Sequence, residues 1–207
     1  MREGGVGRIL VAALHQGIAD RLPSRQEFYE NWFTSVGLRQ GTIGLAAIVA
    51  VLSFLRQEGE PYDPVSRRAG EYAGEWTVDG LSPLRRRLIR ALPRRPRARL
   101  ALGVARDLVR TTYAGSHARV RVRRGAAEIL IRSSIFCGVR ESSAAPLCVF
   151  YAAALANVLK SFDVPSAVRI AGCQGMGERG CRLRVNLTGS AALESGVNEA
   201  VPVPPRV

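Results

Sequence analysis

The chain opens with the three- and four-residue spacing typical of helices that bury one apolar face. Ile9, Leu10, Leu14 and Ile18 recur at this spacing and predict a helix over residues 6–22. A proline then interrupts the pattern. The first segment is therefore expected to be one amphipathic helix packed on a core.

A second helix is predicted directly after this break. Ser24 and Glu27 have the spacing of a capping box, in which the hydroxyl and the carboxylate each satisfy an otherwise unpaired backbone amide. The helix that follows carries Phe28, Trp32 and Phe33.

Apolar periodicity predicts four further helices, with a loop at residues 60–64 and two prolines between the last two helices. They cover residues 42–55, 65–78, 84–92 and 100–113. The first of them is the most apolar run of the chain. At 1.5 Å per residue it is about 20 Å long, which is too short for a bilayer core of about 30 Å. We therefore expect a buried core helix there.

After residue 117 the period changes from that of helices to the alternation of strands. Residues 118–134 alternate, break at Gly125 and alternate again, which predicts a β-hairpin with valines on one face and arginines on the other. Pro146 is expected to open a strongly apolar helix. Residues 164–170 and 181–187 predict a second hairpin.

This order predicts an α+β fold, a small antiparallel sheet packed with helices. Residues 1–64 are expected to be the N-terminal helical part of the same domain, and residues 65–187 its α+β core. Residues 188–207 have no periodicity and end in VPVPPRV, so we expect a disordered tail.

The formal net charge of +13 comes almost entirely from arginine, because Lys160 is the single lysine. The arginines concentrate in residues 85–124, where Tyr113 is the one Phe, Trp or Tyr, so no series of aromatic residues interleaves with them, and no helix-turn-helix or zinc-finger spacing is present. Nucleic-acid binding is therefore disfavoured. A solvated basic face is the simplest interpretation, and an anion-attracting patch for a carboxylated ligand, an acidic partner or a membrane surface is the alternative.

The chain shows no secretory signal and has four cysteines in 207 residues, which favours a cytoplasmic location with cysteines that are thiols or metal ligands. The glycine-rich stretch CQGMGERGC lacks the strand-to-helix context of a dinucleotide site. We expect no nucleotide cofactor and assign no catalytic residue.

Two of these cysteines, Cys173 and Cys181, flank the glycine-rich loop, and Cys148 lies at the start of the apolar helix. A helix N-terminus is expected to lower the pKa of Cys148. Three interpretations stay open: a structural zinc site, buried free thiols, and a Cys173–Cys181 disulfide.

Residues 131–185 resemble the 4-vinyl-reductase domain family. The resemblance rests on Ser133–Ser134 after a strand, Pro146 and Cys148 before the apolar helix, and the two cysteines of the glycine loop. Upstream, LP…ARLAL…TTYAGS over residues 92–116 is similar to bacteriochlorophyll 4-vinyl-reductase-type proteins. The resemblance implies a fold shared with TRAPP trafficking subunits, a relation to regulator domains that sense phenols and alkylbenzenes, and homodimers.

In those sensor domains a zinc ion is held by three cysteines and a glutamate beside a buried aromatic pocket. The resemblance places Cys148, Cys173 and Cys181 on the three cysteine positions. The glutamate position falls on Ile170, which cannot coordinate a metal.

The fourth ligand is then Cys137, Glu141 or water, and the expected metal residues are Cys137, Cys148, Cys173 and Cys181. A zinc site is therefore expected, although the glutamate ligand of the sensor domains is missing from this sequence.

The resemblance implies a binding module that holds a hydrophobic small molecule, either a tetrapyrrole intermediate or an aromatic compound. Such a protein would act as a carrier, an accessory subunit or a stand-alone sensor rather than as a full regulator. The alternatives are a vinyl reductase of (bacterio)chlorophyll biosynthesis and an assembly protein of the trafficking-subunit type. Because no nicotinamide or flavin fingerprint accompanies the cysteines, the binding module is favoured over the enzyme.

Overall fold

The structure, a computed structural model, describes residues 5–33, 43–123, 125–139 and 141–188. The predictions for the tail after residue 188 and for residue 42 lie outside these ranges.

Helices make up the N-terminal part of the chain, as the periodicity predicts. They are α1 (Arg8–Arg21), α2 (Gln26–Glu30), α4 (Leu45–Gln57), α5 (Tyr62–Asp79), α6 (Pro83–Ala91) and α7 (Arg94–Thr112), with a 3-10 turn at Pro23–Arg25. The C-terminal part alternates strands with one long helix. Its elements are β1 (His117–Arg123), β2 (Ala126–Arg132), a 3-10 turn (Ile135–Cys137), α8 (Val149–Ser161), β3 (Ala167–Gly172), a second 3-10 turn (Gln174–Met176) and β4 (Cys181–Asn186).

The four strands form one antiparallel sheet in the order β1-β2-β4-β3. Each predicted hairpin is present, and the two hairpins join through the pairing of β2 with β4. The expected α+β fold, with helices on a small antiparallel sheet, is confirmed.

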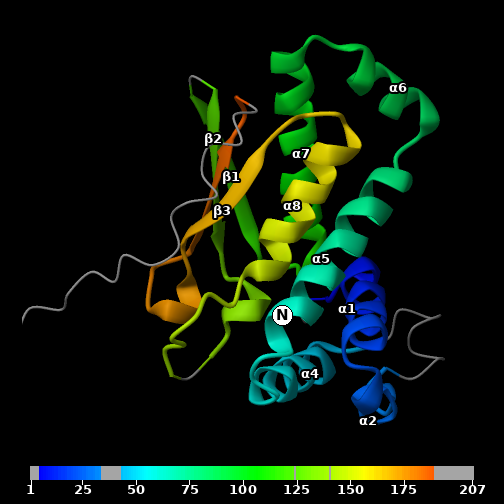
Figure 1. Cartoon of the computed structure of the whole chain (residues 1–207), viewed down its shortest axis with the longest axis vertical. Helices are drawn as coiled ribbons and strands as arrows, with labels where there is room; N and C mark the ends of the chain where they lie inside the picture. Colours follow the sequence, from blue (N-terminus) through cyan, green and yellow to red (C-terminus); the bar gives the residue numbers. More distant parts are fainter. Residues whose placement is uncertain (1–4, 34–42, 124, 140, 189–207) are drawn as a thin grey trace, which may run out of the picture.

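The helices lie on one face of the sheet in two layers (Figure 1). α7 and α8 contact the sheet, α5 packs on α8, and α1 packs on α5. The other face of the sheet carries exposed arginines, among them Arg121 and Arg184, and no described helix covers it. The alternation of valine and arginine in β1 therefore sorts the core face from the solvent face, as predicted.

A glycine allows the close approach of α5 and α8. A Cβ added at Gly70 would lie 2.3 Å from the carbonyl oxygen of Phe150, so a larger residue forces the two helices apart. Phe150 is in the first turn of α8. This contact therefore fixes the N-terminal end of α8, which begins directly after Cys148.

Two predictions about the helix starts are wrong. The capping box of Ser24 and Glu27 is not formed, because residues 23–25 make a 3-10 turn and α2 begins at Gln26 without a side-chain cap bond. Residues 62–64, predicted as loop, belong to α5, since Pro64 fits the first turn of a helix.

Three other boundaries shift for identifiable reasons. α7 starts at Arg94 rather than Leu100, because Pro96 also fits a first turn. Pro146 does not open α8, which begins at Val149 with Cys148 as its N-cap. β3 starts three residues late because the amide of Val164 closes the end of α8 by donating to the carbonyl of Leu159 at 3.0 Å.

No helix in the described ranges is long and apolar enough to cross a membrane. The apolar run that includes α4 forms a core helix, as predicted, with Ile48, Val51, Leu52 and Leu55 fully buried.

Candidate metal centre and adjoining cavity

Four cysteines from four different segments meet at one end of the sheet. Cys137 ends the 3-10 turn after β2, Cys148 precedes α8, Cys173 follows β3, and Cys181 is the first residue of β4. All four are buried, and their sulfur atoms lie within 4.8 Å of one another. The Sγ atom of Cys137 is 3.5 Å from that of Cys173 and 3.4 Å from that of Cys181.

Strand register and a tight loop bring these residues together. Cys181 pairs with Ile131 near the end of β2, from which the turn carrying Cys137 departs. The glycine loop folds back on itself, since the carbonyl of Cys173 accepts from the amides of Met176 and Glu178. Gly177 in this loop has φ +91°, a left-handed conformation that favours glycine.

The sulfur positions fit a tetrahedral zinc ion. Zinc–sulfur bonds of about 2.3 Å place the sulfurs of a tetrahedron roughly 3.8 Å apart, close to the separations found here. This is the one group of three or more His, Cys, Asp or Glu side chains with such ligand spacing in the described part of the chain. The donor set therefore suits zinc.

Two backbone amides point at the sulfur atoms and favour their ionised form. The amide of Leu147 donates to Cys173 Sγ at 3.3 Å, and the amide of Gln174 donates to Cys181 Sγ at 3.5 Å. Hydrogen bonds from charged or polarised groups to a thiolate are the usual support of a thiolate metal site.

The metal-free thiols interact strongly with one another. Hydrogen bonds from Cys137, Cys148 and Cys181 lower the pKa of Cys173, with a smaller contribution from the amide of Leu147. The neighbouring thiols, Cys137 first, raise the pKa of Cys148. The predicted lowering of the pKa of Cys148 is therefore not found in the metal-free cluster, where the neighbouring thiols raise it.

Two helices hold the loops that carry the cysteines. Arg56 at the end of α4 donates to the carbonyl of Phe136 at 3.3 Å, one residue before Cys137. The hydroxyl of Tyr62 in α5 donates to the carbonyl of Leu147 at 2.7 Å, one residue before Cys148. Burial raises the pKa of Tyr62, so its hydroxyl keeps the proton that it donates.

The structure brings all four residues that are expected to bind a metal into one cluster, and their binding of a metal stays a prediction. Cys137 is the fourth member, whereas Glu141 is exposed and outside the group. Ile170 lies in β3 opposite Leu183. All four cysteines are free thiols, so the alternative Cys173–Cys181 disulfide is not formed. Sequence reasoning missed Arg56 and Tyr62, and neither residue type nor spacing marks them.

A cavity of about 290 Å³ adjoins the cysteine cluster, between α4 and the end of β2. Ser134 in its wall has a buried hydroxyl with no hydrogen-bond partner among the described residues, and the hydroxyl of Tyr151 in the core is in the same state. The lining is largely apolar and consists of Leu45, Val49, Leu52, Arg56, Tyr113, Ser133, Ser134, Ile135, Gly138 and Gln174.

Aromatic rings pack tightly beside the cluster. Phe136 stacks on Phe150 with ring centroids 4.6 Å apart, and Tyr151 meets the two rings edge-on at 5.3 and 5.4 Å. Phe136 and Phe150 lie one and two residues from Cys137 and Cys148. The cysteines, the aromatic cluster and the cavity thus share one region.

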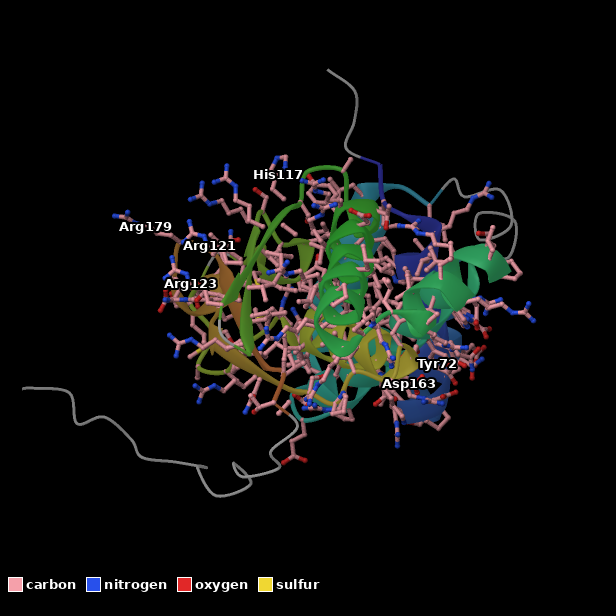
Figure 2. All side chains as sticks on the ribbon, turned by 90° about the horizontal axis from the view of Figure 1, so that it is seen from above. Tyr72, His117, Arg121, Arg123, Asp163 and Arg179 are labelled. Atoms are coloured by element: carbon pink, nitrogen blue, oxygen red, sulfur yellow. The ribbon has the colours of Figure 1, made fainter. Side chains whose placement is uncertain are left out.

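The other surfaces of the molecule are charged. A groove of about 800 Å³ between α5 and the end of α8 is lined by side chains of both signs, including Arg67, Glu71 and Lys160. Figure 2 shows Arg121, Arg123 and Arg179 extending away from the molecule on the sheet side, opposite Tyr72 and Asp163. A pocket of about 460 Å³ on the sheet face mixes arginines with apolar side chains such as Ala127 and Val168, and none of the four cysteines lines it.

Several solved structures match this chain, among them the following two. The phenol-responsive sensory domain of the transcription activator PoxR, solved with phenol, has a TM-score of 0.50 and 15% identity, covering 69% of this chain and 74% of that domain. A trafficking protein particle complex subunit 3 from Naegleria fowleri, covalently bound to palmitic acid, has a TM-score of 0.46 and 13% identity, covering 77% and 92%.

No protein-family model matches the sequence, and no curated protein matches it. The expected likeness to phenol-sensing regulator domains is found at the level of the fold. Membership of the 4-vinyl-reductase family stays a prediction, and so do the homodimer and the cytoplasmic location.

Proposed function

We propose that this chain is a small-molecule-binding module in which a zinc ion fixes the wall of a cavity for a hydrophobic ligand. The observation that carries the proposal is the adjacency of the two sites. Gly138 and Gln174 of the cavity wall directly follow Cys137 and Cys173 in the sequence. A metal held by these cysteines would therefore set the shape of the cavity.

Cys137, Cys148, Cys173 and Cys181 would hold the zinc. Four protein ligands close the coordination of a tetrahedral zinc ion, which makes such a site structural rather than catalytic. When bound, the ion would supply folding free energy by joining four segments of the chain. Arg56 and Tyr62 hold the segments that bear Cys137 and Cys148, and so pre-position two of the ligands.

The volume of the cavity favours a single aromatic ring over a tetrapyrrole. An apolar cavity of about 150 Å³ accepts benzene, and drug-sized ligands occupy about 300–1,000 Å³. At about 290 Å³ this cavity admits a substituted ring and is small for a macrocycle of four pyrroles. The PoxR domain of similar fold was solved with phenol, which supports the same ligand class.

The polar groups of the cavity suit a ring that carries a hydroxyl. The buried hydroxyl of Ser134 has no partner in the described chain, and a ligand hydroxyl would satisfy it. Arg56 also lines the cavity and supplies a cationic donor. Apolar walls with a few placed polar groups are the usual composition of a ligand site.

Thermal unfolding of the full chain with phenol and p-cresol tests the proposal. A ligand at 100 times its dissociation constant stabilises the native state by about 2.7 kcal/mol, which raises the melting temperature by roughly 5–10 °C. The V49W variant fills the cavity mouth and should abolish the shift. M176W, at a similarly exposed position outside the cavity, should keep it.

An unchanged melting temperature with both phenols, or an equal shift in V49W, would contradict the ligand site. A stable protein partner in pull-downs together with no ligand effect would favour the assembly alternative.

A further inference from the structure

Helix α6 exposes two leucines on its outer side. Leu84 is 68% exposed and Leu88 is 60% exposed, the highest values among the large apolar side chains that the structure describes. They lie four residues apart, so they are neighbours on one face of the helix. Together they form an apolar stripe that no described element covers.

The inner side of α6 fixes this orientation. Ile89 is 3% exposed and packs in the core. Arg86 pairs with Asp79 at 3.0 Å, and Arg90 donates to the carbonyl of Ser161 at 2.9 Å. Rolling the helix to bury its leucines would break all three contacts, so the exposed stripe is a stable feature of the fold.

The stripe lies in the most basic part of the chain. Residues 80–106 contain nine arginines and no aspartate or glutamate. Arg85 and Arg87 flank the leucines, and Arg95 and Arg99 follow at the start of α7. These four side chains are exposed and make no ion pair within the part of the chain that the structure describes.

We propose that α6 and the first turns of α7 form a docking surface for an acidic lipid bilayer. Helices that lie in a membrane interface combine exposed leucines with flanking arginines, because the apolar side chains enter the acyl boundary while the cations meet anionic headgroups. α6 stands at an outer corner of the molecule, on the side away from the sheet (Figure 1). The proposal is independent of the ligand and the metal.

The combination of exposed arginines and exposed leucines fits an acidic lipid bilayer better than the other anionic partners. A nucleic acid would pair with the arginines and leave the leucines in water, since no aromatic residue is present in residues 80–106 for base stacking. A second copy of this chain docked through the same surface would bring the four exposed arginines of one copy against those of the other, and this repulsion opposes self-association.

Vesicle flotation with the full 207-residue chain tests the proposal. The protein should bind vesicles of 30% phosphatidylglycerol in phosphatidylcholine at 0.1 M NaCl, and should not bind pure phosphatidylcholine. Binding should weaken at 0.5 M NaCl because salt screens the headgroup charges. L84S/L88S should lower the partition coefficient at least about ten-fold, since each leucine contributes apolar burial. L84F/L88F should retain binding.

Two double variants that remove the same amount of charge test which surface of the molecule binds the membrane. R85Q/R87Q should weaken binding and reduce its salt dependence, whereas R121Q/R184Q removes two exposed arginines of the sheet face and should leave binding unchanged. Unfolding curves of all variants should superimpose, because the replaced side chains are exposed. Quenching of L88W by brominated lipid gives a second readout, which should exceed the quenching of the wild-type chain.

Three results would overturn the proposal. One is failure of the wild-type chain to bind the acidic vesicles, and another is equal binding by L84S/L88S. The third is a dimer in solution that L84S/L88S dissociates, because it would assign the leucine stripe to a second copy.

Discussion

The cysteine end and the α6 end of this molecule differ in what each is suited to contact. At the cysteine end, four thiols are buried with their sulfur atoms within 4.8 Å of one another. At the α6 end, two leucines face solvent beside Arg85 and Arg87, which make no ion pair within the described part of the chain. Buried cysteines are ordinary in a core, but four thiols at this spacing suit a bound metal ion. Exposed leucines among cations suit an apolar, anionic phase outside the molecule.

The stability of the chain should depend on the cysteine end far more than on the exposed stripe. C173S removes one of the four cysteines proposed to bind zinc and should lower the free energy of unfolding by about 4 kcal/mol, or roughly 10 °C in melting temperature. L84S/L88S should change it by less than about 0.5 kcal/mol. Denaturant unfolding of the two variants measures both free energies. A C173S effect near 1 kcal/mol would contradict the expected difference between the two ends.

Substitutions at two adjacent residues of α6 should differ sharply in their effect on the free energy of unfolding. I89A removes a buried side chain and should destabilise the fold by about 2–3 kcal/mol, whereas L88A removes an exposed one and should cost less than about 0.5 kcal/mol. Urea unfolding checks both variants. Equal effects would mean that α6 is rotated, and the lipid-facing stripe would then be lost.

The support of the cysteine end by α5 should appear in metal affinity. Y62F deletes the bond from its hydroxyl to the carbonyl of Leu147 and should cost about 1 kcal/mol of stability and about ten-fold in zinc affinity. Y72F deletes an equivalent hydroxyl bonded to Asp20, far from the cluster, and serves as the control. Competition with a zinc chelator measures affinity, and equal affinities in the two variants would exclude the support role of Tyr62.

The smallest expected effect lies on the surface of α1 and α5, away from both ends. Hydrogen bonds from Arg68, Tyr72 and Gln16 lower the pKa of Asp20 from 3.8 to about 2. Because the folded pKa is below the unfolded one, this contribution is present above about pH 4 and is lost as the pH falls through 2. After discounting for partial exposure it is worth roughly 1 kcal/mol. The difference in unfolding free energy between wild type and D20N should shrink over that range, and a pH-independent difference would contradict the pairing.

The grouping of Cys148, Cys173 and Cys181 was predicted from the resemblance to a domain family, and the predicted second hairpin places Cys173 and Cys181 on either side of one loop. The choice of Cys137 over Glu141 needed the structure, since it depends on how the turn after β2 folds back. Arg56 and Tyr62 were not predictable, because their partners are backbone carbonyls about 80 residues away.

The α6 end shows the limit of periodicity. Leu84, Leu88 and Ile89 are all apolar, and the helix was predicted correctly over residues 84–92. Which of the three faces the core depends on Asp79 and the end of α8, both outside the helix. The misplaced starts of α5 and α7 have a similar origin, since a proline in a first turn reads in the sequence like a break.

Native and denaturing mass spectrometry of the full chain, with zinc quantified on the same sample, tests the account most directly. The account predicts one zinc per chain in the native spectrum, its loss on denaturation, and its absence from C173S. Four freely titrating thiols and no zinc in folded wild-type protein would contradict it, because the cysteine cluster would then be a packing feature of the core.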